Sequence, residues 1–170
     1  MNMINWIKDM FPFHRSLTGK GNIQTLNYLK KINNELKIKY FESGKKVFDW
    51  IIPDVWEITE AYFLDKNGKK YADLKKNNLH VVQYSKPINK IVTKKDLIKN
   101  LYTLPKFPNL IPYVTSYYNK TWGFCIQDNV KKKLPIGNYK VVINSKFTKG
   151  KMHYGEINFK GREKKEIFFS

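Results

Sequence analysis

The sequence predicts an α+β fold, in which amino-terminal helices precede a β-rich region of mostly antiparallel strands. Three observations support this prediction. Apolar residues recur every three or four positions from Ile23 to Leu36, as in an amphipathic helix. Alternating apolar and polar residues begin at Lys37. Asn67-Gly68 lies between two such alternating segments and supplies the positive φ angles of a tight hairpin turn.

Three helices are expected. Residues 3–10 predict a short helix that Pro12 ends. The apolar stripe of the second helix, with Asn22 as its N-cap, requires another surface for burial. Thr93 is expected to cap a third helix, which spaces Leu97, Ile98 and Leu101 on one face and ends before Pro105.

The remaining pattern predicts strands joined by turns. A second tight turn is expected at residues 149–151, and residues 104–118 are expected to form an extended loop because they contain three prolines. The strand candidates are residues 37–41, 47–52, 57–64, 70–74, 79–84, 122–126, 139–143, 153–159 and 166–169. The last of these is strongly apolar and has no following element to cover it, so we expect a chain cut short of a larger sheet.

The formal net charge is +18, which raises the question of nucleic-acid or anionic-polymer binding. Only Arg15 and Arg162 are arginines, whereas bidentate phosphate recognition is mainly an arginine property. The lysines are scattered along the chain, which favours a solvated surface. A noncatalytic module that binds an anionic glycan or nucleic acid stays open as the alternative function.

Single residues limit the chemistry further. Cys125 is the only cysteine, so neither an internal disulfide nor a cysteine-based zinc site is expected. His14, His80 and His153 lie far apart, without a second ligand at i+2 to i+4, and predict no metal site. Nucleophile and phosphate-loop motifs are absent from the sequence. We find neither a secretory signal nor a membrane-spanning apolar run, so a soluble, cytoplasmic protein is expected.

Several segments, in their order along the chain, resemble one family of bacterial aminopeptidase-like proteins. These segments are FPFHRSLTGKGN, ESGKKVFDWIIPDVWEI, NNLHVVQYSKP, LYTLPKFPNLIPYVTSYYNKTWGFC, HYGEINFKG and EIFFS. The resemblance covers residues 10–170. The family is often described as a domain of unknown function, and it has a zinc-exopeptidase fold with an inserted β-rich domain.

This resemblance implies three parts. Residues 1–43 and 151–170 would begin an α/β zinc-exopeptidase-like core, and residues 44–150 would be the inserted domain. In the family the metal ligands follow the segment that matches EIFFS. The chain is therefore expected to be inactive alone, with zinc bound only in full-length members, whose substrate would be a peptide or an acyl-amino compound. A downstream peptidase-core segment or a second chain is the expected partner.

Candidate ligand-binding residues lie in two segments. Arg15 and Ser16 lie in a turn, where an arginine can orient a carboxylate; the alternative is that they brace the following helix. Tyr117, Tyr118 and Trp122 belong to an aromatic run that could line a pocket, or could pack in the core.

Overall fold

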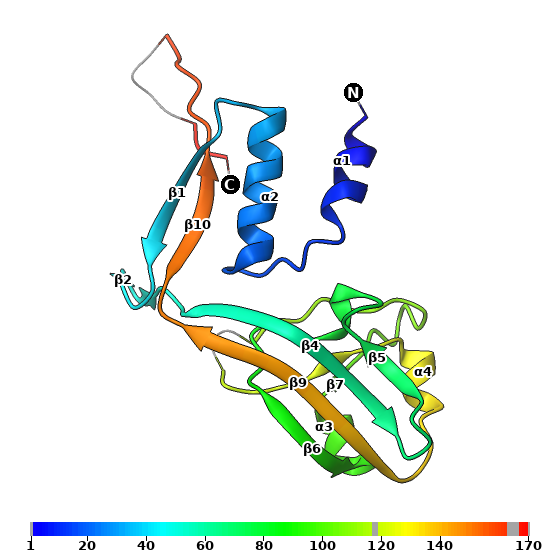
Figure 1. Cartoon of the computed structure of the whole chain (residues 1–170). Coiled ribbons are helices and arrows are strands. Elements are labelled where there is room, and N and C mark those ends of the chain that lie inside the picture. The colour runs from blue at the N-terminus through cyan, green and yellow to red at the C-terminus, as the bar shows by residue number, and fades with distance from the viewer. Residues whose placement is uncertain (1, 117–118, 163–166, 170) are drawn as a thin grey trace.

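The computed structural model describes residues 2–116, 119–162 and 167–169. Two regions follow one another along the long axis of the molecule (Figure 1). One is the helical layer, made of α1 (Met3–Met10), α2 (Lys20–Ile32) and the antiparallel ribbon of β1 (Lys37–Glu42) and β10 (Lys151–Glu156). The other is the β-rich part, which contains all elements from β2 to β9.

One antiparallel sheet organises the β-rich part. Its strand order is β5-β4-β9-β6, formed by β4 (Val55–Asp65), β5 (Lys70–Asp73), β6 (Ile88–Thr93) and β9 (Asn138–Thr148). Two strand pairs are short: β2 (Lys46–Val47) with β3 (Trp50–Ile51), and β7 (Leu101–Tyr102) in parallel with β8 (Phe124–Cys125). The helices are η1 (Asn78–His80), α3 (Lys94–Lys99) and α4 (Asp128–Lys132).

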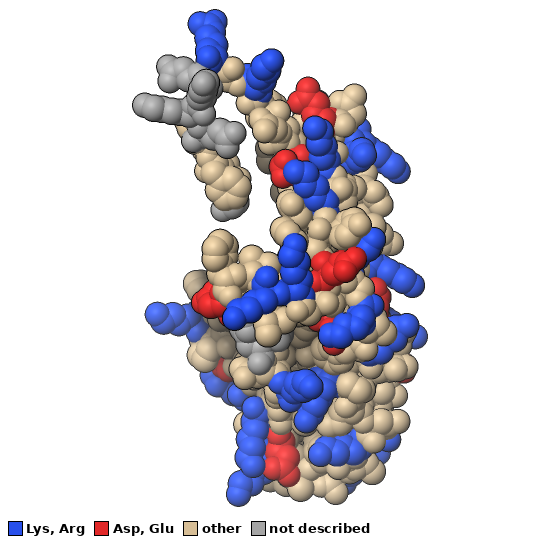
Figure 2. All heavy atoms as spheres, turned by 90° about the vertical axis from the view of Figure 1, so that its left-hand side faces the viewer, with Lys and Arg blue, Asp and Glu red and all other residues tan. Residues whose placement is uncertain are grey.

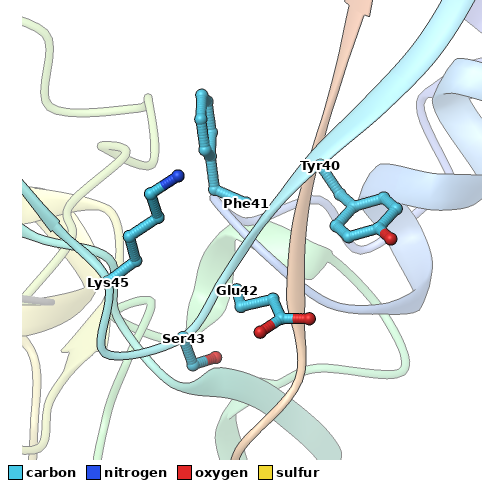
Figure 3. A pocket seen from close by; sticks show the side chains of 5 residues that line it. All are labelled: Tyr40, Phe41, Glu42, Ser43 and Lys45. Atoms are coloured by element: carbon cyan, nitrogen blue, oxygen red, sulfur yellow. The ribbon is translucent and has the colours of Figure 1, made fainter.

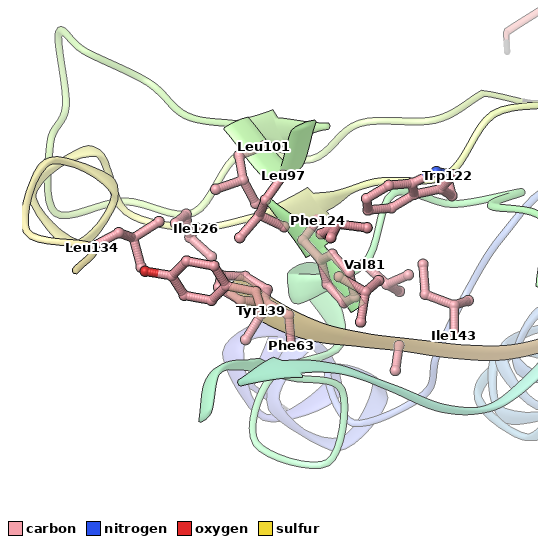
Figure 4. Close-up of a cluster of buried hydrophobic side chains, with 14 of the residues drawn as sticks. Phe63, Val81, Leu97, Leu101, Trp122, Phe124, Ile126, Leu134, Tyr139 and Ile143 are labelled. Carbon is pink, nitrogen blue, oxygen red and sulfur yellow. The ribbon is translucent and has the colours of Figure 1, made fainter. Parts of the chain in front are cut away.

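The hydrophobic core lies on one face of this sheet (Figure 4). Phe63 of β4 is fully buried, with its ring centroid 5.3 Å from that of Phe124 and 5.9 Å from that of Tyr139. Leu97 of α3 and Leu134, which follows α4, close the cluster from the other side. Aromatic rings bury large apolar areas, so this cluster stabilises the β-rich part.

The helical layer, in contrast, has almost no core of its own. Within residues 2–43 and 151–162, Leu36 is the only large apolar side chain that is buried. It packs with Leu26 against Gly155, where a Cβ atom would lie 2.9 Å from Leu36. No described residue of α1 is buried, and Met3 and Ile7 are exposed. The layer therefore presents apolar surface to its surroundings.

The α+β class and the mostly antiparallel pairing are confirmed. The helix over residues 3–10 forms as predicted, and so do the cap at Thr93, whose Oγ1 accepts from Asp96 N at 3.2 Å, and the turn at Asn67-Gly68. Strands at 37–41, 57–64, 70–74 and 139–143 are confirmed within one to five residues at their ends. Described residues 104–116 form the predicted loop without helix or strand.

The predicted start and end of the second helix are wrong. Gly19 is the N-cap residue, and Asn22 lies in the first turn, where its amide donates to the carbonyls of Leu17 (2.9 Å) and His153 (3.3 Å). Asn33 ends the helix, so Leu36 lies beyond it. The side chain of Asn22 makes tertiary contacts, which local sequence cannot reveal. Leu101 likewise lies in β7, beyond α3.

Several strand predictions also need correction. Residues 79–84 contain no strand; their pairing is limited to isolated bridges. Residues 47–52 break into β2 and β3 because Phe48 has a positive φ of 53°. Only 124–125 of 122–126 form a strand, and β10 spans 151–156 instead of 153–159. The turn at 149–151 joins strands of two different sheets, so it makes no hairpin.

The predicted terminal strand at 166–169 does not form in its described part. Residues 167–169 have no strand conformation and are exposed, and residue 166 lies outside the described residues. The sequence pattern does not predict β6, α4 or the short β7. Each is brief or polar, and tertiary pairing supports it more than its own pattern does.

Candidate functional site

A short segment between η1 and β6 connects the helical layer to the loops of the β-rich part. We call residues 82–86 the junction segment. Tyr84 has a φ of 62°, a left-handed conformation that costs a bulky residue about 1–3 kcal/mol. Such strain persists only where surrounding contacts fix the backbone. Those contacts define the site.

Gln83 connects two loops through its buried side chain. Its amide Nε2 donates to the carbonyl oxygen of Arg15, and its Oε1 accepts from the Tyr113 hydroxyl at 3.0 Å. Its backbone N–H donates to Val114 O, and its carbonyl accepts from the Ser116 N–H, both at 2.9 Å. One residue thus links the turn that bears Arg15 to the loop that bears Tyr113.

Tyr84 anchors the same turn from a second position. Its hydroxyl lies 2.6 Å from Thr18 Oγ1 and donates to Asp54 O at 3.3 Å. Its ring stacks on Trp56 with a centroid distance of 5.6 Å. Thr18 Oγ1 also accepts from the Trp56 backbone N–H at 3.0 Å. The turn before α2 is therefore bound to β4 and to the junction segment together.

Ser85 completes this network inside the core. Its carbonyl accepts from Trp56 Nε1 at 3.0 Å and from Ser145 Oγ at 2.7 Å. Its hydroxyl donates to Val82 O at 2.5 Å and accepts from Gly123 N at 3.2 Å. Ser85 is fully buried, and both functions of its hydroxyl are occupied, so its role is structural.

The two loops that Gln83 links carry the predicted ligand-binding residues. Arg15 has an exposed side chain without an ion pair to any described residue. Ser16 Oγ donates to Thr18 O at 2.6 Å, which is the bracing interaction of the alternative interpretation. Tyr117 and Tyr118 lie outside the described residues.

Trp122 belongs to the core. Its side chain is 8% exposed and its ring packs edge-on to Phe124 with a centroid distance of 6.4 Å, as the packing interpretation expects. The sequence pattern does not single out Gln83 and Tyr84. Both lie in the NNLHVVQYSKP segment of the family resemblance, in the part predicted as a strand.

Burial favours the neutral form of three ionisable side chains in this part of the molecule. His14 packs on Trp56 with a ring distance of 5.5 Å, and burial lowers its pKa. Burial also lowers the pKa of His80, whose Nδ1 lies 2.9 Å from Cys125 O. The pKa of the Cys125 thiol is raised to about 12 by burial. A thiol in this state is a poor nucleophile at neutral pH.

The described residues contain neither a metal-binding cluster nor a membrane-spanning helix. No three of their His, Cys, Asp and Glu side chains gather closely enough to hold an ion. Within the same residues, every helix is too short or too polar to cross a bilayer.

A hollow of about 360 Å³ lies where β1 meets the β2–β3 pair (Figure 3). Phe41 and Lys45 lie on one side of the chain and Tyr40 and Glu42 on the other. Lys45 Nζ is 5.4 Å from the centre of the Phe41 ring, and Ser43 Oγ donates to Gly150 O at 3.1 Å. None of its lining residues belongs to the junction segment or to the two loops that Gln83 links.

Lysines are spread over both regions on the face shown in Figure 2, with acidic side chains between them. Some are paired, as in Lys39–Glu156 and Lys149–Asp54, both at 2.7 Å. Dispersed charge of this kind is typical of a solvated surface and does not favour an anionic-polymer site.

Comparison with known proteins gives three results. Residues 55–146 match the family described as "Domain of unknown function (DUF2172)". A protein of Clostridium acetobutylicum named "Putative polysaccharide biosynthesis protein with aminopeptidase-like domain" is 40% identical over 166 residues, which cover 98% of this chain and 38% of that protein. A crystal structure titled as a "putative peptidase" from the same organism matches with a TM-score of 0.83 and 42% identity, over 89% of this chain and 36% of that one.

The chain thus spans well under half the length of these two relatives. The family match runs from the start of β4 into β9 and includes the junction segment and the Tyr113 loop. Because it covers more than half of the 170 residues, the chain belongs to the family defined by the domain of unknown function DUF2172.

Proposed function

We propose that this chain is the recognition part of an aminopeptidase-like metallohydrolase. In this proposal residues 44–150 form an inserted recognition module, and residues 1–43 and 151–170 belong to the peptidase-like core. The names of the two relatives support the enzyme class. The link that Gln83 makes between the Arg15 turn and the Tyr113 loop is the observation that carries the recognition role.

The strand pairing supports the proposed insertion. Glu42, the last residue of β1, pairs with Lys151, the first residue of β10. Next to this pair, Ser43 N donates to Gly150 O at 2.9 Å. The chain between them thus leaves and re-enters the helical layer at one place, as an inserted domain does.

The helical layer supports the proposed partner. Its helix α1 exposes Ile4, Ile7 and Phe11, and the layer has too few buried apolar side chains to be stable as an independent unit. We propose that a further peptidase-core segment, in the same polypeptide or in a second chain, covers this surface.

The described residues of this chain do not fit a catalytic zinc, which takes three protein ligands and keeps one open position. We therefore assign zinc, and with it the hydrolytic step, to the partner segment. This chain would supply a wall of the cleft and ligand contacts, with Arg15 directed to the ligand and Ser16 bracing the turn.

A chimera tests this function. In it, the present chain replaces the 166-residue region to which it aligns in the Clostridium acetobutylicum relative. We expect the chimera to release amino acids from short peptides, to lose this activity with a zinc chelator and to regain it with added zinc. The present chain alone should be inactive under the same conditions.

Two controls make the result decisive. The intact relative shows whether the peptides chosen are substrates, and the relative without the aligned region shows whether that region is needed. A deleted relative as active as the intact one would contradict the recognition role. Hydrolysis by the present chain alone would contradict the assignment of the chemistry to the partner segment.

A further inference from the structure

We propose that Gln83 is a positioning residue for a carboxylate-binding site, in which the Arg15 guanidinium receives the carboxylate of a ligand beside the Tyr113 loop. The ligand class is an N-acyl amino acid or the carboxyl end of a short peptide. This inference rests on the proposed recognition function and deepens it.

The backbone of Arg15 is held in place, and its exposed side chain can contact a ligand. Within residues 14–19 it is the only exposed residue, whereas Thr18 and Gly19 are buried. The turn is fixed at two points, because Gln83 Nε2 donates to Arg15 O and Thr18 binds Tyr84 and Trp56. The long side chain therefore projects from a rigid base, which lowers the entropy cost of binding.

The choice of arginine at this position also points to a ligand. Thirty of the 32 basic residues are lysines, so the composition of the chain strongly favours lysine. Solvation needs only a charge, and lysine provides it. A guanidinium differs in its planar fork, which binds a carboxylate through two parallel hydrogen bonds.

The carboxamide of Gln83 is suited to linking the two loops. It donates through one atom, to Arg15 O, and accepts through the other, from the Tyr113 hydroxyl. A carboxylate would lack the donor and an ammonium would lack the acceptor. Tyr113 is 62% exposed next to this link, so a ligand at the Arg15 turn can reach it.

The test titrates the full chain with N-acetyl-leucine, followed by two-dimensional NMR. N-acetyl-leucinamide serves as the matched ligand without a carboxylate. We expect the acid to bind more tightly than the amide. Arg15→Gln should weaken acid binding about 10- to 100-fold, the range for losing a charge-assisted pair of hydrogen bonds, and leave amide binding unchanged. Lys20→Gln removes the same charge close by and should change little.

Gln83→Met distinguishes positioning from simple packing. It retains the apolar stem and the length of the side chain but removes both hydrogen bonds to the loops. We expect the preference for acid over amide to fall about tenfold, because a displaced Arg15 loses its hydrogen-bonded contact with the carboxylate. The amide should bind as before. Tyr113→Phe tests the same link at an exposed position, so it remains informative if Gln83→Met does not fold.

Each outcome has one meaning. A wild-type chain that binds neither ligand contradicts the proposed recognition function. Equal binding of acid and amide overturns the carboxylate site and leaves the recognition function standing. Preference for the acid that survives Arg15→Gln overturns the carboxylate site. Preference that is lost in Arg15→Gln but survives in Gln83→Met and Tyr113→Phe overturns the positioning role of Gln83 and leaves the recognition function standing.

Discussion

The hydroxyl oxygens of Thr18 and Tyr84 lie 2.6 Å apart, although the two residues are 66 positions apart in the sequence. Thr18 Oγ1 also accepts from the backbone N–H of Trp56. The contact therefore ties the turn before α2 to the first strand of the main sheet and to the left-handed residue of the junction segment. Both of these hydrogen bonds are buried.

Replacing this hydroxyl should destabilise the fold. Thr18→Val keeps the shape of the side chain but leaves the Trp56 N–H without its acceptor in a buried place. We expect a loss of about 1–3 kcal/mol in the free energy of unfolding, measured by urea denaturation. Thr18→Ser retains the hydroxyl and should lose less. Equal stability of Thr18→Val and wild type would show that this contact contributes nothing.

Gly21 should not tolerate alanine even though it lies in α2. At a solvent-exposed position of a helix, replacing glycine by alanine stabilises the fold by about 1 kcal/mol. Here a Cβ atom would overlap the backbone carbonyl of His14, which can move only with the whole turn. We expect the overlap to outweigh the helix propensity and to lower the melting temperature.

Gln24→Ala is the matched control for this substitution. Gln24 is exposed in the same helix, so its replacement should leave stability unchanged or raise it slightly. A Gly21→Ala variant as stable as this control would mean that the turn before α2 packs less closely than described.

Much of the fold was predictable because its elements have strong local patterns. The sheet strands β4 and β9 are rich in β-branched and aromatic residues, and Thr93 caps α3 through a contact only three residues away. The error at 79–84 has the opposite origin. Its alternation resembles a strand, but Val82 N bonds to Gly123 O and Gln83 bonds to loop residues, so tertiary pairing overrides the local pattern.

The candidate site was predictable only in part for the same reason. Arg15 could be singled out because arginine is rare in this chain and lies in a turn. Gln83 could not, because its side-chain partners are 68 and 30 residues away. A glutamine within an apolar alternating segment carries no sign of these partners. Trp122 was equally ambiguous, since an aromatic ring suits a pocket and a core alike.

Cys125 should be inert in the folded chain. Its side chain is fully buried, and burial raises the pKa of its thiol to about 12, so almost no thiolate exists at pH 8. We expect slow reaction with a disulfide reagent such as Ellman's reagent under native conditions and complete reaction in denaturant. Rapid modification of the native chain, at a rate close to that of the unfolded chain, would contradict this burial.

The stability of the chain should fall as the pH is lowered through the range in which histidine titrates. Burial lowers the pKa of both His14 and His80 below the usual 6.5, so the unfolded chain binds protons more readily than the folded chain. The contribution of the two neutral histidines to the free energy of unfolding is fully present above about pH 6.5. It is lost as the pH falls through the folded-state pKa of each. Each histidine can add at most about 1.4 kcal/mol per pH unit to the slope of the free energy of unfolding against pH.

Histidine variants separate this effect from the titration of carboxylates, which takes place at lower pH. Glutamine at position 80 can still donate to Cys125 O, so His80→Gln should keep much of the local packing and flatten the slope between pH 7 and 5. The double variant His14→Gln/His80→Gln should flatten it further. Urea denaturation at half-unit pH intervals measures this. A slope in the double variant that equals the wild-type slope would mean that these two histidines do not carry the pH dependence.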